Sequence, residues 1–103
     1  MWLFVFFDLP THTKADRREA TRFRSRLLKD GYTMMQFSVY IRHCASHESA
    51  EVHLARLNAM LPPKGQVSVA QFTDKQFSRI QNFWGHGYAA LPPPPPPPQL
   101  ELF

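Results

Sequence analysis

Cysteine is almost absent from this chain of 103 residues, in which Cys44 is the single example. One cysteine cannot form a disulfide within the chain, so a disulfide-stabilised secreted scaffold is excluded and a reducing compartment is favoured. Long apolar runs are absent as well. The apolar run at residues 2–7 is too short to span a bilayer, and it lacks the basic flank and the cleavage site of a signal peptide. We therefore expect a cytoplasmic protein without membrane contacts.

Acidic residues are scarce relative to basic ones, with eight Asp and Glu against 12 Lys and Arg and a formal net charge of +4. Seven of those 12 basic residues fall in residues 14–29, where Asp16 and Glu19 are the only acids. This concentration is compatible with two interpretations, a surface that binds a polyanion or a solvated helix face. Apolar residues make up 44% of the chain, which indicates a globular domain rather than a disordered chain.

The hydrophobic pattern predicts four strands and two helices. Residues 2–7 are apolar at every position, which is typical of a strand buried on both faces. Residues 32–44 have strand composition but are too long for one typical strand. The expected elements, in chain order, are a strand at 2–7, a helix at 14–29 with the stripe Ala20, Phe23 and Leu27, two strands within 32–44 joined near 36–38, a helix after the N-cap Ser46 with the stripe Ala50, Leu54, Leu57 and Leu61, and a strand at 66–73.

This order, β-α-β-β-α-β, predicts an α+β ferredoxin-like fold, in which both helices pack on one face of an antiparallel sheet. The first strand is apolar on both sides, so the second face of the sheet also needs a cover. A second copy of the chain is the simplest one, and we expect a homodimer packed through the sheets. Residues 74–84 are expected to form a short irregular or helical close.

Asp8 ends the most apolar segment of the chain. Strand ends are common positions for functional side chains, and Mg²⁺ favours oxygen ligands while taking only one or two carboxylates. Asp8 is thus a candidate metal ligand and catalytic residue. The alternative is that Asp8 only stabilises a turn before Pro10.

The basic residues of the first helix are regularly spaced. Arg18, Arg22 and Arg26 recur every four residues, which places them on one side of a helix. Guanidinium groups pair with phosphate oxygens in a bidentate manner, so this row fits contacts that carry position rather than sequence information. The candidate nucleic-acid-binding residues are Arg17, Arg18, Arg22, Arg24, Arg26 and Lys29.

A zinc site at His43, Cys44 and His47 is rejected. His43 and Cys44 are adjacent in a predicted strand and therefore point to opposite faces. No fourth ligand follows at a familiar spacing, and structural zinc sites use four. His12 and His53 are expected on the surface.

Three segments together resemble a known family. "WLFVFFDLP" (2–10), "LLKDGYTMMQFSVYIRH" (27–43) and "TDKQF" (73–77) are similar to the small CRISPR-associated proteins of spacer acquisition, with details most similar to members from type II systems. The resemblance covers residues 1–86. It implies a ferredoxin-like homodimer that bridges two dimers of the larger CRISPR integrase subunit and holds the middle of a double-stranded prespacer DNA.

The family resemblance also implies a role for Asp8. It occupies the position of the family's magnesium ligand, and two such aspartates face each other across the dimer axis, where they hold Mg²⁺ or Mn²⁺. The leading expectation is a non-sequence-specific DNA-binding scaffold of the integrase complex. The alternative is a metal-dependent endonuclease on RNA or DNA that uses paired Asp8. A third possibility is an RNA-binding or toxin-like ribonuclease module.

The tail differs in composition from the rest of the chain. We expect a ferredoxin-like domain at 1–87 and a linker with a docking peptide at 88–103, because seven prolines at 92–98 form a semi-rigid spacer of roughly 20 Å. The terminal "QLELF" has two interpretations. It docks on the larger integrase subunit, or it binds the sliding clamp, because it is similar to the clamp-binding peptides of bacterial replication proteins. Its candidate docking residues are Gln99, Leu100, Leu102 and Phe103.

Overall fold

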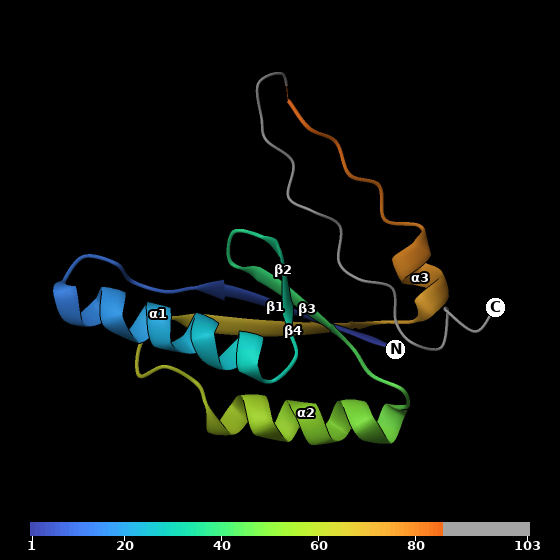
Figure 1. The fold of residues 1–103 in the computed structure, drawn as a ribbon, viewed down its shortest axis with the longest axis horizontal. Helices are drawn as coiled ribbons and strands as arrows, with labels where there is room; N and C mark the ends of the chain where they lie inside the picture. Colours follow the sequence, from blue (N-terminus) through green and yellow to red (C-terminus); the bar gives the residue numbers. More distant parts are fainter. Residues whose placement is uncertain (86–103) are drawn as a thin grey trace.

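The computed structural model describes residues 1–85, which form one antiparallel sheet with helices on both faces (Figure 1). The strand order across the sheet is β2-β3-β1-β4. The elements in chain order are β1 (Trp2–Asp8), α1 (Lys14–Lys29), β2 (Thr33–Gln36), β3 (Val39–His43), α2 (His47–Ala59), β4 (Gln66–Phe72) and α3 (Asp74–Ser78). The predicted α+β ferredoxin-like arrangement is confirmed, including the division of residues 32–44 into two strands.

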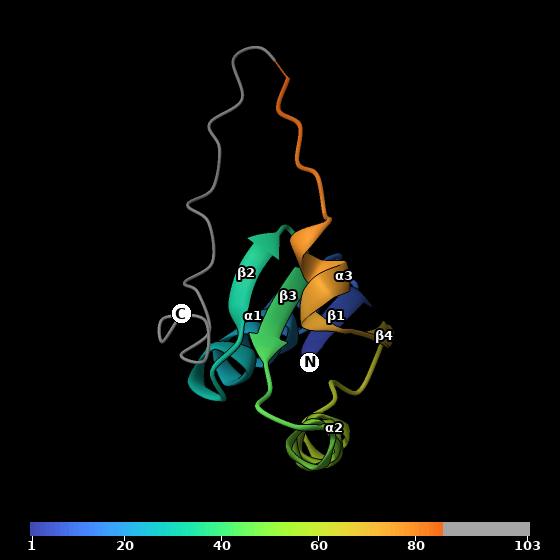
Figure 2. The same ribbon diagram turned by 90° about the vertical axis from the view of Figure 1, so that its right-hand side faces the viewer.

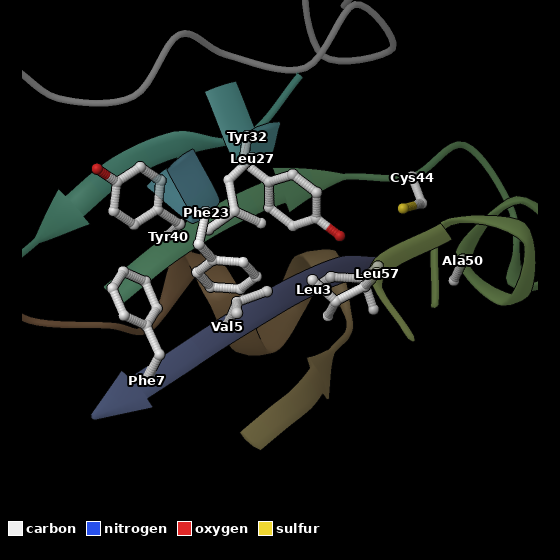
Figure 3. Close-up of a cluster of buried hydrophobic side chains, with 10 residues drawn as sticks. All are labelled: Leu3, Val5, Phe7, Phe23, Leu27, Tyr32, Tyr40, Cys44, Ala50 and Leu57. Carbon is white, nitrogen blue, oxygen red and sulfur yellow. The ribbon is translucent and has the colours of Figure 1, made fainter. Parts of the chain in front are cut away.

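The first face of the sheet carries the main core and both long helices, as predicted (Figure 3). Successive side chains of a strand point to opposite faces, and Leu3, Val5 and Phe7 of β1 therefore share this face. Phe23 of α1 packs edge-on against Phe7, with ring centroids 5.3 Å apart. The core extends to α2 through side chains such as Leu57, which is 3% exposed.

The second face is covered at one end by α3 of the same chain (Figure 2). Trp2 stacks on Phe77 with ring centroids 3.9 Å apart, and Phe4 meets the edge of the same Phe77 ring. Part of the cover that was expected from a second copy is therefore supplied by α3 of the same chain. At the other end of the face, Phe6 is still 40% exposed.

Local signals set the helix boundaries. In α1, the Thr13 hydroxyl accepts a hydrogen bond from the Asp16 amide, and the Asp16 carboxylate accepts one from the Thr13 amide, which is a capping box. Ser46 caps α2, as predicted. The predicted stripe of α2 was wrong at its end, because α2 stops at Ala59 and Leu61 is 44% exposed. Leu61 precedes Pro62, and a residue before proline is disfavoured in helical conformation.

The predicted boundary at residue 87, the polyproline segment and the docking peptide with Gln99, Leu100, Leu102 and Phe103 lie outside the described residues. Within residues 1–85, no helix combines the length and the apolar character needed to cross a bilayer.

Candidate nucleic-acid interface

Asp8 is the last residue of β1 and is exposed, opposite Gln66 in the adjacent strand β4. The chain approaches it closely at Gly65, which has φ +94°, a left-handed conformation that favours glycine. A Cβ at residue 65 would lie 2.6 Å from the Asp8 carbonyl oxygen. The backbone around Asp8 is thus tightly packed, while its side chain faces solvent.

Among residues 1–85, Asp8 has no cluster of further ligands around it. The part of the chain that the structure describes contains no group of three or more His, Cys, Asp and Glu side chains able to hold a metal. A metal site at Asp8 therefore requires a second chain or the phosphates of a bound nucleic acid.

Cys44 joins the core of the first face, whereas the His43 ring packs against Trp2 with ring centroids 5.1 Å apart. The two side chains therefore point to opposite faces, as predicted.

The basic side chains of α1 line a shallow groove along the outer side of the helix. It lies opposite the face that buries Ala20, Phe23 and Leu27 in the core. The lining residues are Lys14, Arg17, Arg18, Thr21, Arg22, Ser25, Arg26 and Lys29. Five of the six predicted nucleic-acid-binding residues are thus brought together, and the groove also includes Lys14, which sequence analysis did not single out.

Arg24, the sixth predicted residue, is half-buried away from this groove. Its guanidinium carbon lies 5.9 Å from the centroid of the Phe7 ring. This is a cation–π contact, which ties α1 to the end of β1.

Few acidic groups neutralise the groove. Glu19 lies 3.6 Å from the Arg22 guanidinium, and Arg17 donates a hydrogen bond to the Thr11 carbonyl at 3.1 Å. Within residues 1–85, Arg18 and Arg26 form no ion pair. Several unneutralised guanidinium groups on one helix repel each other, and a bound polyanion relieves that repulsion.

Three basic residues outside α1 are engaged in the fold. Arg42 is half-buried and donates to the Asp30 carbonyl oxygen. The Lys64 ammonium lies 3.6 Å from the Asp16 carboxylate, and Arg56 donates to Asp30 at 3.1 Å. Lys75 and Arg79 of the α3 region are exposed and form no ion pair within residues 1–85, so most, but not all, of the free positive charge of the described residues lies on α1.

A buried polar cluster links the end of α1 to α2, and sequence analysis missed it. His53, expected on the surface, is 7% exposed, with Nδ1 at 3.4 Å from the Asp30 carboxylate. Its position was readable from the spacing, since His53 lies between Ala50 and Leu57 on the apolar side of α2. Burial, followed by the charge of Asp30, raises the pKa of the neighbouring Tyr32 to about 12.

A second polar contact holds α3 on the sheet. Asp74 accepts a hydrogen bond from the Met1 ammonium at 2.9 Å and lies 3.2 Å from Nε2 of His43. The hydrogen bond from the ammonium is the main cause that lowers the pKa of Asp74. Burial is the main cause that lowers the pKa of His43. This contact lies at the end of β1 opposite to Asp8.

Known proteins share both the sequence and the fold. The family model "CRISPR associated protein Cas2" matches residues 1–80. A protein of Flavobacterium psychrophilum is 50% identical over 103 residues, which cover 100% of this chain and 88% of that protein. A protein of Parvibaculum lavamentivorans is also 50% identical over 103 residues and is covered over its full length. Both carry the name CRISPR-associated endoribonuclease Cas2.

A solved structure agrees in fold. The crystal structure of Streptococcus pyogenes Cas2 at pH 6.5 superposes with a TM-score of 0.60 at 19% sequence identity, and covers 82% of this chain and 100% of its own. The family match, the full-length relatives and the shared architecture lead to one conclusion: the chain belongs to the CRISPR-associated Cas2 family.

Proposed function

We propose that this protein is a non-sequence-specific DNA-binding scaffold of the CRISPR spacer-acquisition complex. In this role it bridges dimers of the larger integrase subunit and holds double-stranded prespacer DNA. The observation that carries the proposal is the basic groove of α1, with its exposed and largely unneutralised arginines. The lining consists of basic side chains together with Thr21 and Ser25, and their row along one helix suits contacts to the phosphates of a nucleic-acid backbone.

The length of the groove suits a duplex backbone. α1 has 16 residues, which corresponds to about 24 Å. Successive nucleotides of one DNA strand are spaced by about 3.4 Å along the helix axis, so one groove extends along about seven base pairs. Two copies of the chain double that length. A homodimer therefore supports binding of the middle of a prespacer better than a monomer does.

The second face of the sheet supports the homodimer. Phe6 is 40% exposed there, and the α3 helix covers only the end of the face around Trp2 and Phe4. An apolar area left open at the centre of a sheet is a frequent site of subunit contact.

A metal-dependent endonuclease is the second candidate function. It is favoured by the name endoribonuclease that the relatives carry and by the exposure of Asp8 at the end of β1. Carboxylate oxygens suit Mg²⁺ or Mn²⁺, and two Asp8 side chains from two copies supply the one or two carboxylates that such an ion takes from protein. A bound ion would supply an activated water and would polarise a phosphodiester. The contribution of this chain is to hold two Asp8 carboxylates at the end of a rigid central strand.

One assay tests both functions. Prespacer integration by the larger subunit is measured with the wild-type protein, with Asp8→Ala and with the double variant Arg18→Ala/Arg26→Ala. We expect Asp8→Ala to stay dimeric and to support integration. The double variant is expected to bind DNA more weakly and to abolish integration. A plot of the logarithm of the DNA association constant against the logarithm of the salt concentration has a negative slope. The magnitude of this slope should fall by about 0.9 for each phosphate that the variant no longer neutralises.

The matched control is Lys75→Ala/Arg79→Ala, which removes the same charge from exposed positions outside α1. An unchanged salt slope in the Arg18/Arg26 variant would contradict the scaffold proposal. Loss of integration in a dimeric, DNA-binding Asp8→Ala protein would instead favour the enzyme.

The terminal peptide is proposed to bring the complex to a partner. Its residues Gln99, Leu100, Leu102 and Phe103 alternate in a manner that suits docking on the larger integrase subunit. The sliding clamp is the second candidate partner, on the similarity of "QLELF" to clamp-binding peptides. Binding of each purified partner to a protein lacking residues 99–103 distinguishes the two, and retention of both interactions would exclude a docking role.

A further inference from the structure

Two short hydroxyl side chains lie among the basic residues of the α1 groove. Thr21 and Ser25 belong to its lining, together with Arg18, Arg22 and Arg26. They are four residues apart, so they lie on the same side of the helix, one turn after the other. Because both side chains are shorter than arginine, they leave the helix surface accessible between the guanidinium groups.

The fold does not use the hydroxyl groups of Thr21 and Ser25. In a helix interior, such hydroxyls often bond back to the carbonyl oxygen one turn earlier. Within residues 1–85, neither hydroxyl forms a hydrogen bond, whereas the Ser78 hydroxyl of α3 donates to the Lys75 carbonyl at 2.7 Å. Ser and Thr are also weaker helix formers than Ala, Lys or Arg. Their presence on the outer side of α1, where core packing does not decide the residue type, favours a role in binding.

The two hydroxyl residues are part of a four-residue repeat. The segments "REAT" (18–21) and "RFRS" (22–25) each begin with an arginine and end with a hydroxyl residue. Side chains at positions i and i+3 of a helix are neighbours, with Cβ atoms about 5–6 Å apart. Arg18 with Thr21, and Arg22 with Ser25, therefore form two equivalent pairs of a guanidinium and a hydroxyl. The second pair is displaced from the first by four residues, which is about 6 Å along the helix axis.

Each pair offers the donors that a phosphodiester accepts. The planar guanidinium donates two parallel hydrogen bonds and neutralises the negative charge. The hydroxyl donates one more hydrogen bond to an oxygen that the guanidinium leaves free. Consecutive phosphates of a nucleic-acid strand are separated by a distance similar to the spacing of the two pairs. The contact of Arg22 with Glu19 at 3.6 Å is solvent-accessible, so a bound phosphate replaces it at little cost.

We propose that each pair binds one phosphate of the same nucleic-acid strand, with the Thr21 and Ser25 hydroxyls as hydrogen-bond donors to two consecutive phosphates. The proposal rests on the proposed function, because it requires DNA in the basic groove. It adds that the groove selects a phosphate backbone over other polyanions. General electrostatic attraction acts on every polyanion, whereas neutral donors at a fixed spacing favour the one whose acceptors match that spacing.

The first test separates hydrogen bonds from charge. Binding of a fluorescein-labelled blunt DNA duplex is measured over a range of salt concentrations for the wild type, Thr21→Val/Ser25→Ala and Thr21→Ser. The matched control is Ser78→Ala, which removes a hydroxyl outside α1. The double variant is expected to bind the duplex about five- to a hundred-fold more weakly, because it loses two hydrogen bonds to charged groups. Its dependence on salt is expected to stay unchanged, since no charge is removed. Thr21→Ser and Ser78→Ala are expected to bind as the wild type does.

A second polyanion tests the selectivity. Poly-L-glutamate carries many negative charges but no phosphodiesters. Its binding is expected to change less than about two-fold in the double variant, because it is held by charge alone. An equal loss for the duplex and for poly-L-glutamate would contradict the selection of phosphates.

The other outcomes contradict the proposal in different ways. Unchanged duplex binding in the double variant removes the role of the hydroxyls, and the scaffold function stands if the wild type still binds duplex. A loss that is accompanied by weaker salt dependence, or by lower helix content in circular dichroism, indicates a general effect on the groove. Weak binding by Thr21→Ser shows that the hydroxyl at residue 21 is not the group required. Absence of duplex binding in the wild type contradicts the proposed function itself.

Discussion

Gly65 determines the backbone path next to Asp8, the residue for which a catalytic role is proposed. It combines a left-handed φ of +94° with a position where any Cβ would lie 2.6 Å from the Asp8 carbonyl oxygen and 2.8 Å from Leu9 Cδ2. Any residue other than glycine is therefore disfavoured at position 65 for two reasons, because the backbone is left-handed and because its Cβ would clash with neighbouring atoms. A glycine in a surface loop thereby shapes the backbone beside the candidate carboxylate Asp8.

Gly65→Ala is accordingly expected to destabilise the protein by about 1–3 kcal/mol, as judged from the cost of strained backbone conformations. The free energy of unfolding in urea measures this effect. Gly85→Ala is the control, because a Cβ at residue 85 meets no atom within 4 Å. Equal stability of the two variants would show that the backbone at residue 65 relaxes without strain.

Asp30 joins α1 to α2 through charged contacts. It is the C-cap residue of α1. Its carboxylate accepts a hydrogen bond from Arg56 of α2 at 3.1 Å and lies 3.4 Å from Nδ1 of His53, also on α2. His53 is 7% exposed and approaches this carboxylate without a hydrogen bond, so the hydrogen bond from Arg56 is the direct link between the two helices. The relative placement of α1, which carries the basic groove, therefore depends on this carboxylate.

Asp30→Asn is expected to reduce the free energy of unfolding by about 1–3 kcal/mol, because it removes the charge from the hydrogen bond that Arg56 donates, and hydrogen bonds to charged groups contribute about this much. Chemical denaturation measures the difference. The control is Glu51→Gln, which removes a carboxylate from the exposed pair with His47 at 3.6 Å. Exposed pairs contribute about 0–1 kcal/mol, so this second change should be small. A large effect at Glu51 or none at Asp30 would overturn this account of the helix contact.

At the scale of the whole molecule, the second face of the sheet is only partly covered. The α3 helix buries Trp2 and Phe4, whereas Phe6, on the same face of β1, stays 40% exposed. The proposed homodimer would cover this remaining area, and it would bring two Asp8 residues and two basic grooves into one particle.

Phe6→Asp is therefore expected to convert the dimer into a monomer, because a charge at the centre of an apolar contact loses its hydration without gaining a partner. Multi-angle light scattering or sedimentation measures the mass. Val52→Asp is the control, since Val52 is 53% exposed on the outer side of α2. A Phe6→Asp protein that remains dimeric would place the subunit contact elsewhere.

Much of the architecture was predictable from the sequence because its signals are local. The unbroken apolar strand, the helical stripe Ala20, Phe23 and Leu27 and the N-cap Ser46 all act within a few residues. The exposure of the arginine row was predictable for the same reason, since one side of α1 is apolar and the opposite side must face solvent. Sequence thus determined the elements, their order and the charged groove.

Other features were decided only by tertiary structure, because they depend on contacts between segments far apart in the chain. The stacking of Phe77 on Trp2 covers one end of the second face, and Asp30 draws His53 into the interior. The periodicity of apolar residues indicates which side of a helix or strand is buried. The segment that packs against that side is determined only by the packing of the whole chain.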